Sequence, residues 1–303
     1  MTDQPVRAIV GPTGAGKSAM AMEVAHAGAS VEIVAIDAFT VYRGMDIGTA
    51  KPSAADRATV AHHMIDVLDP DQAVDVQWFQ AEARAAIADT QARSHEVLLV
   101  GGSGLYFRAV VDDLRFPPTE PDVRAAIHDR WADDPPAGHR HLATIDPAAA
   151  AKIEPDNVRR TVRALEVIEL TGQPFSSFAD AWDNRQAIYP DLEVTYLEPP
   201  TPDLRQAIAQ RSRGMVDEGL LDEAADLRRR FSDGLSHTAE QAIGYAEAFA
   251  VLDGHCSVDD LPDAIATRTW AYARRQRAWF RADPRCMAPS GRADGTIQQP
   301  HTL

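Results

Sequence analysis

A glycine-rich turn near the amino terminus constrains the fold of this chain more than any other feature of the sequence. Its eight residues fit the P-loop pattern without a mismatch: Gly11, Pro12, Thr13, Gly14, Ala15, Gly16, Lys17 and Ser18. A short apolar run precedes the turn and a predicted helix follows it, which is the context that the motif requires. Glycines let backbone N–H groups approach phosphate oxygens, and the helix amino terminus adds partial positive charge. The motif therefore predicts a diphosphate or phosphate site, with Lys17 at the terminal phosphate and the Ser18 hydroxyl on Mg²⁺.

Predicted strands alternate with predicted helices before and after this turn. Residues 6–10, 32–36 and 97–100 are apolar and read as buried strands, while 17–27 and 76–93 read as helices. This alternation predicts a parallel sheet that is covered by helices on both faces. We therefore expect an α/β fold with a P-loop NTPase-like parallel sheet core.

The pattern changes in the middle of the chain. Residues 116–190 contain helical stretches and no convincing strand, and one helix is expected from Asn157, a capping residue, to Gly172. Strand character returns at 192–197. We expect an all-helical insertion domain at 116–190, between two parts of the core at 1–115 and 191–287. The polar residues 288–303 are expected to form a disordered tail.

Charge and composition exclude several classes of protein. Thirty basic and forty-five acidic residues give a formal net charge of −15, which argues against nucleic-acid binding by the molecule as a whole. Between Ile265 and Arg285, however, six arginines accompany a single acid, so a local basic face is possible. No apolar run has the ~18 residues that a membrane helix needs. With no secretory signal and only two cysteines, the chain is expected to be cytoplasmic.

Asp37 is the acid best placed for chemistry. It follows the strand 32–36, and the carboxyl ends of strands face the ligand crevice in an open α/β sheet. The strand 97–100, where a nucleotide-hydrolysing protein would usually carry a magnesium-binding acid, ends instead in Gly101-Gly102-Ser103-Gly104. Asp37 could also be a strand-end acid that caps the following turn.

Together these segments resemble the tRNA dimethylallyltransferases, also called tRNA isopentenyltransferases. The resemblance rests on the P-loop and on seven further blocks in the family's order: 37–52, 62–70, 100–106, 146–150, 159–172, 241–245 and 274–281. It implies transfer of a dimethylallyl group from dimethylallyl diphosphate to N6 of the adenine at tRNA position 37, next to the anticodon. It also implies a P-loop that binds the prenyl diphosphate, and a helical insertion that grips the tRNA anticodon stem-loop.

The resemblance also implies roles for individual residues. Asp37 would accept the proton of the adenine amine, and Thr13, Lys17, Arg211 and a Mg²⁺ ion on Ser18 would stabilise the leaving diphosphate. The tRNA would be bound by Asp37 and its neighbours Ala38, Phe39 and Thr40, and by Ser103, Arg159, Arg160, Arg163, Gln241, Gly244, Tyr245, Arg274, Arg277 and Arg281. Family members usually carry serine and glutamine where this chain has Ala38 and Thr40, so base recognition differs in detail.

Three other functions compete with this one. An adenylate isopentenyltransferase would use a free nucleotide and needs no arginine-rich helices. A small-molecule P-loop kinase would not explain the block 37–52, and a non-enzymatic RNA-binding module has no use for a complete P-loop beside Asp37. The adjacent His62 and His63 lack a third ligand, which favours a structural role over a metal site. We expect a monomeric enzyme without membrane contact.

Overall fold

The computed structural model describes residues 5–28, 30–178 and 185–286. The chain folds into two compact units, one formed by residues 1–110 and 189–303 and the other by 111–188. The sequence had predicted an insertion at 116–190, close to the unit 111–188. The expected tail 288–303 lies outside the described residues. Among the described helices, none is both long and apolar enough to cross a membrane.

The first unit is built on a five-stranded sheet in the order β3-β2-β4-β1-β5. All of its pairings are parallel, which confirms the predicted α/β class. The strands are β1 (Val6–Val10), β2 (Val31–Ile36), β3 (His62–His63), β4 (Glu96–Gly101) and β5 (Glu193–Tyr196). Every residue of β2 is buried, because parallel strands in the middle of a sheet are covered on both faces.

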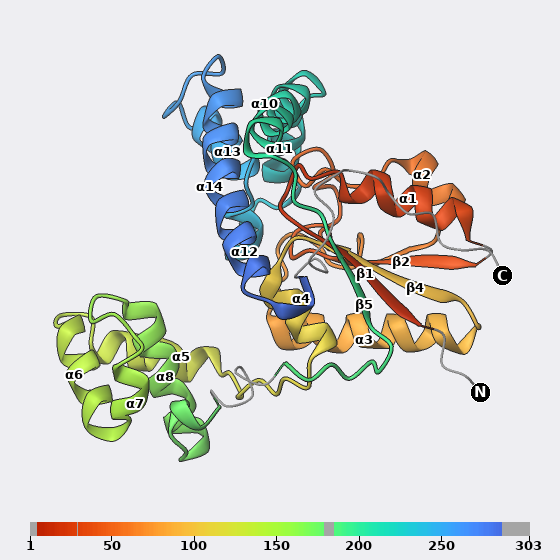
Figure 1. Cartoon of the computed structure of the whole chain (residues 1–303). Helices are drawn as coiled ribbons and strands as arrows, with labels where there is room; N and C mark the ends of the chain where they lie inside the picture. Colours follow the sequence, from red (N-terminus) through yellow and green to blue (C-terminus); the bar gives the residue numbers. More distant parts are fainter. Residues whose placement is uncertain (1–4, 29, 179–184, 287–303) are drawn as a thin grey trace. The chain divides into compact units, whose positions relative to one another are not determined.

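Helices cover the two faces of this sheet. Figure 1 shows α1 (Lys17–Ala27) on one face and α3 (Val76–Ala92) on the other. The α1 side is packed by an apolar cluster that includes Ala21, Ile33 and Leu98. The first part of the chain also contains the short α2 (Ala54–Thr59) and, after β4, α4 (Gly104–Val111).

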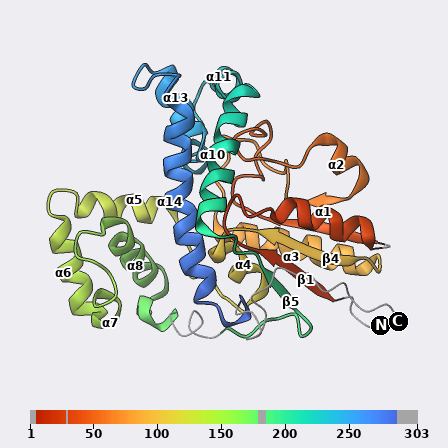
Figure 2. The ribbon, with the colours of Figure 1, turned by 45° about the horizontal axis from the view of Figure 1, so that its top comes forward.

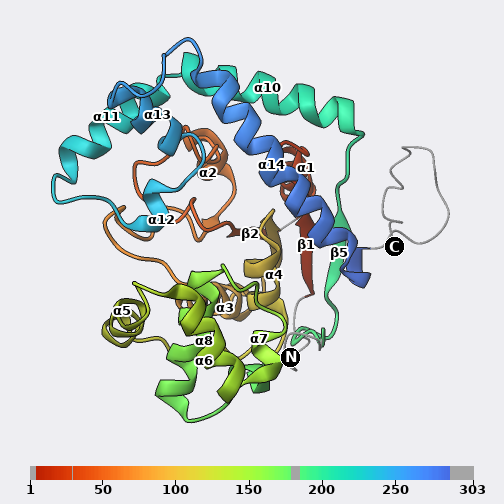
Figure 3. The same cartoon turned by 90° about the vertical axis from the view of Figure 1, so that its left-hand side faces the viewer.

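The carboxy-terminal part of the first unit is helical. It contains α10 (Thr201–Asp217), α11 (Leu220–Arg230), α12 (His237–Glu240), α13 (Tyr245–Leu252), α14 (Leu261–Arg281) and the 3₁₀ turn η2 (Pro284–Cys286). Helices α10 and α14 lie side by side and share a small apolar core with Leu204, Ile208 and Ala273 (Figure 2). Figure 3 shows α11 and α13 beside the amino-terminal end of α14.

The second unit consists of helices. They are α5 (Pro121–Arg130), α6 (Pro135–Ile145), α7 (Pro147–Ala150), α8 (Val158–Thr171) and the 3₁₀ turn η1 (Phe175–Phe178). Helix α8 begins and ends where the sequence predicted, because the Asn157 side chain accepts a hydrogen bond from the Arg160 N–H and Gly172 adopts the left-handed conformation. Val162 and Leu165 pack into this unit's own apolar core.

Candidate active site

The P-loop joins the end of β1 to the start of α1. Gly14 and Gly16 have φ angles of 82° and 84°, a region that other residues rarely adopt, so the turn depends on glycine at both positions. The Lys17 ammonium donates a hydrogen bond of 2.8 Å to the carbonyl of Pro12. Ser18 is exposed in the first turn of α1. Burial, and next the positive charge of Arg211, lower the pKa of Lys17 to about 8, although the nearby carboxylate of Asp37 opposes this shift.

Asp37 comes directly after the buried strand β2. Its Oδ1 accepts a hydrogen bond of 2.8 Å from the Phe39 N–H, and its carbonyl accepts one of 3.5 Å from the Thr40 hydroxyl. Burial raises the pKa of the Asp37 carboxyl, while the Phe39 N–H and the charges of Lys17 and Arg211 act in the opposite direction. A half-buried carboxyl near two cations, with a raised pKa, is suited to accept a proton.

Arg211 reaches the P-loop from the middle of α10. Its Nη2 donates a hydrogen bond of 2.5 Å to the Thr13 hydroxyl. Burial lowers the pKa of Arg211, and the charge of Asp37 counteracts that effect. The structure thus brings together the four residues for which a catalytic role was expected, Thr13, Lys17, Asp37 and Arg211, although the first and last are 198 positions apart in the chain.

Two adjoining cavities meet at these residues. The larger cavity, of about 360 Å³, includes Lys17, Ser18 and His62 in its wall. The smaller one, of about 70 Å³, includes Phe39 and Ile243. Both are lined by the same five residues, namely Thr13, Asp37, Thr49, Arg211 and Tyr272. Asp37 therefore lies where a ligand in one cavity would meet a ligand in the other.

Comparison with known proteins assigns the family. A model of the family described as "IPP transferase" matches residues 40–283. The chain belongs to this family. A tRNA dimethylallyltransferase of Bifidobacterium longum subsp. infantis is 45% identical over 287 residues, which cover 93% of this chain and 85% of that protein. One from Kineococcus radiotolerans is 46% identical over 293 residues and covers 93% and 89%.

Solved structures of the IPP transferase family have the same fold. The full-length tRNA isopentenylpyrophosphate transferase of Bacillus halodurans matches with a TM-score of 0.65 and 36% identity, covering 93% of this chain and 88% of that one. A eukaryotic dimethylallyltransferase acting on tRNA matches with a TM-score of 0.78 and 25% identity, covering 91% and 70%. The resemblance seen in the sequence is confirmed, and the chain is a transferase of dimethylallyl groups.

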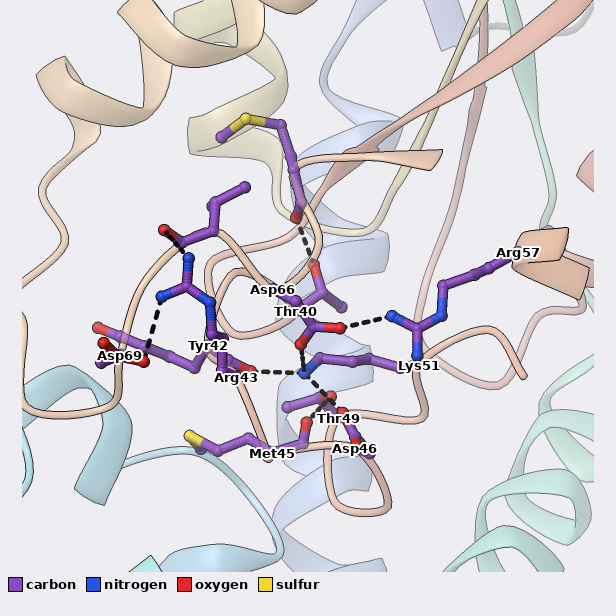
Figure 4. Close-up of polar contacts among 12 residues, drawn as sticks. Thr40, Tyr42, Arg43, Met45, Asp46, Thr49, Lys51, Arg57, Asp66 and Asp69 are labelled. Carbon is purple, nitrogen blue, oxygen red and sulfur yellow. Dashed lines mark hydrogen bonds and ion pairs between the residues drawn. The ribbon is translucent and has the colours of Figure 1, made fainter. Parts of the chain in front are cut away.

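A polar network holds the loop after Asp37 in place (Figure 4). The side chain of Lys51, only 1% exposed, donates to the carbonyl of Tyr42 and to the carboxylates of Asp46 and Asp66, at 2.8 and 2.6 Å from these two. Arg57 binds the second oxygen of Asp66. The network joins two of the blocks on which the family resemblance rests, 37–52 and 62–70.

A second set of hydrogen bonds, centred on Glu223 and Tyr245, also holds the loop after Asp37. The carboxylate of Glu223, on α11, accepts hydrogen bonds from the N–H groups of Asp46 and Ile47 at 3.1 Å and from the Tyr245 hydroxyl. The Gly48 N–H donates to the same hydroxyl. Tyr245 was expected to bind tRNA; its side chain is fully buried, and its hydroxyl takes part in the hydrogen bonds that hold the loop.

The other residues expected near the base lie around this loop. Ala38, Phe39 and Ser103 are half-buried, and Thr40 is buried with its hydroxyl also 3.4 Å from the Met64 carbonyl. Gly244 is buried at the start of α13, where an added Cβ would lie 3.5 Å from the Cα of Gly48. Gln241 is exposed, and its carbonyl accepts a hydrogen bond from Arg268. Of these residues only Phe39 lines the smaller cavity.

The six arginines expected to bind tRNA fall into two groups. Those with exposed side chains and no ion pair among the described residues are Arg159, Arg160 and Arg274. The others have partners within their own unit: Arg163 binds buried Glu166 and two carbonyls, while Arg277 and Arg281 share Glu198. Helical spacing had placed Arg274, Arg277 and Arg281 on one face, but the side chain of Arg277 is only 12% exposed.

Two residues of α14 lie at the site although the sequence analysis named neither as a site residue, even though Gln276 stands inside the block 274–281. Tyr272 lines both cavities, and the side-chain amide of Gln276 binds the backbone of Thr13 and Gly102. The signal that could have revealed Gln276 is its position on the buried stripe of α14, which includes Ile265, Ala273 and Phe280. A polar side chain on such a stripe needs a buried partner.

Proposed function

We propose that this chain transfers the dimethylallyl group of dimethylallyl diphosphate to N6 of the adenine at tRNA position 37, giving N6-dimethylallyladenosine. The observation that carries the proposal is the place of Asp37, facing Lys17 and Arg211 at the junction of two cavities in a member of the IPP transferase family. The larger cavity, beside the P-loop, would hold the diphosphate. The adenine would reach Asp37 through the smaller one, after leaving the stack of the anticodon loop.

The reaction is a displacement at the first carbon of the dimethylallyl group. The adenine N6 forms a bond to that carbon, the bond from the carbon to the diphosphate oxygen breaks, and the diphosphate leaves with the bonding electrons. Asp37 accepts the proton that N6 loses. Backbone N–H groups of Gly14 and of residues 16–18, the Lys17 ammonium and the Arg211 guanidinium stabilise the negative charge that grows on the leaving group. Thr13, held by Arg211, would stand beside the oxygen of the breaking bond.

The P-loop is suited to Mg²⁺ brought by a diphosphate. Within residues 5–28, 30–178 and 185–286, no group of three or more His, Cys, Asp or Glu side chains could hold a metal ion. These side chains alone therefore do not form a complete coordination site for Mg²⁺. Mg²⁺ commonly takes one or two protein oxygens and fills its remaining positions with phosphate oxygens and water. The exposed Ser18 hydroxyl beside Lys17 fits that pattern. An ion held there would neutralise charge on the leaving diphosphate.

The tRNA would be gripped by exposed arginines of both units. Arg159 and Arg160 on α8 and Arg274 on α14 have side chains free to reach phosphates. Every residue that lines the two cavities belongs to the unit formed by 1–110 and 189–303 of a single chain. We propose that the enzyme acts as a monomer, in the cytoplasm.

The experiment is acceptor selection with labelled dimethylallyl diphosphate. The protein is offered tRNA, the matching anticodon stem-loop, the same stem-loop with guanine at position 37, or AMP. Label should enter only the first two. Transfer to AMP alone would instead support an adenylate isopentenyltransferase, an alternative that the family's tRNA-modifying relatives do not favour.

A further inference from the structure

The side-chain amide of Gln276 bridges two turns at the carboxyl ends of neighbouring strands. Its Oε1 accepts a hydrogen bond of 2.8 Å from the Thr13 N–H, in the P-loop after β1. Its Nε2 donates one of 2.8 Å to the carbonyl of Gly102, in the turn after β4. The residue is 5% exposed, and a Cβ at Gly102 would lie 2.4 Å from this Nε2, so the close approach requires glycine there.

Thr13 is consequently held by two helices at once. Gln276 from α14 fixes its backbone N–H, and Arg211 from α10 fixes its hydroxyl. Because its N–H is turned toward Gln276, Thr13 contributes to the site through its hydroxyl. The Ala15 N–H is bonded to the Pro12 carbonyl, so Gly14 and residues 16–18 supply the backbone donors for phosphate. Helices α10 and α14 pack against each other, and this packing fixes the position of Arg211 relative to Gln276.

A small displacement of Thr13 would lower the rate of the reaction. Its hydroxyl stands with Asp37 and Arg211 at the junction where the two cavities meet. A displacement of about 1 Å at a group that orients reactants can lower a rate by about 10²-fold. Without Gln276, the Thr13 N–H and the Gly102 carbonyl would each lose their partner, and the turn would be free to shift.

We propose that Gln276 is a positioning residue for the transfer reaction, which acts by fixing Thr13. The proposal rests on the proposed function. Gln276→Leu should lower the rate of the chemical step by about 10- to 100-fold, while affinity for tRNA stays within about twofold of the wild type. The matched control is Ser212→Ala on α10, which removes a buried hydroxyl that, among the described residues, donates a hydrogen bond to the Ile208 carbonyl. Its rate should stay within about twofold of the wild type.

A double-mutant cycle with Thr13→Ala separates positioning from general destabilisation. If Gln276 acts through Thr13, the pair Thr13→Ala with Gln276→Leu should be no more than about twofold slower than Thr13→Ala alone, in single-turnover transfer to saturating tRNA. Independent losses that multiply in the double variant would overturn the proposal. Gln276→Met, which keeps the length of the side chain but offers no amide oxygen to the Thr13 N–H, provides the same cycle if the leucine variant does not fold.

The same assay distinguishes this proposal from the proposed function. Absence of transfer to tRNA by the wild-type protein would contradict the function itself. Normal wild-type transfer together with an unaffected Gln276→Leu variant would overturn only the role of Gln276.

Discussion

Replacing Asp37 by asparagine tests the chemical step directly. The side-chain oxygen of asparagine can still accept the hydrogen bond from the Phe39 N–H, at 2.8 Å in the present structure, so the turn after β2 should persist. An amide cannot take the proton of the adenine amine. A positioned general base contributes about 10²- to 10⁴-fold to a rate, which corresponds to about 2.7–5.4 kcal/mol of activation free energy. We expect the Asp37→Asn variant to lose that factor in turnover and to retain tRNA binding.

The pH profile gives a second readout for the same variant. Burial raises the pKa of Asp37, so the ionised base should be lost at a higher pH than for an exposed aspartate. The wild-type rate should therefore fall as the pH drops below this raised pKa, and that acid limb should be missing in the variant. Since the charge of Asp37 raises the pKa of Lys17, its removal should lower that pKa further.

The assay is single-turnover transfer at saturating tRNA and dimethylallyl diphosphate, with tRNA affinity measured separately. The control is Asp75→Asn, because the Asp75 carboxylate also accepts a backbone N–H at 2.8 Å but lines neither of the two cavities. Its rate should match that of the wild type. A near-normal rate for Asp37→Asn, or an acid limb that survives in it, would refute the reasoning.

Three further predictions concern charge. Because the pKa of Lys17 is about 8, affinity for dimethylallyl diphosphate should weaken as the pH rises through 8. Lys17→Arg should remove this dependence on pH, and calorimetry from pH 7 to 9 measures both affinities. Arg274→Glu should weaken tRNA binding and reduce its salt slope by about one with no change in melting temperature, whereas Arg277→Glu should lower the melting temperature by opposing Glu198. For Glu32, burial raises the pKa but bonds from Arg93, two histidines and a threonine lower it to about 2, so its folded pKa lies below the unfolded value. It should stabilise the fold by about 3 kcal/mol above pH 4.5 and lose that contribution as the pH falls toward 2, and chemical denaturation of Glu32→Gln should show the loss at neutral pH.

The sequence predicted what local patterns determine. The strands at 32–36 and 97–100 and the helices at 17–27 and 158–171 were found within one residue at each end, since apolar runs and capping residues mark them. The P-loop motif also predicted the turn between β1 and α1. Strand β3 was missed, because two residues, His62 and His63, become a strand only through pairing with β2.

Contacts between distant residues could not be predicted from patterns. Helical spacing assigns Arg277 to a face, but it does not reveal that half-buried Glu198, 79 positions earlier in the chain, binds it. The role of Gln276 is hidden for the same reason, because its partner in the P-loop lies far away in the sequence.

The order of the strands in the sheet affects when the site can fold during translation. β1 and the P-loop are made first, yet β1 lies between β4 and β5, and the partner of the Thr13 N–H is 263 residues further along the chain. At about 5–20 residues per second, that distance takes roughly 13–50 s to synthesise. During this interval the nascent chain already carries the P-loop turn but lacks the side chain that holds the Thr13 N–H, so the site of the folded protein can form only after Gln276 on α14 has been synthesised.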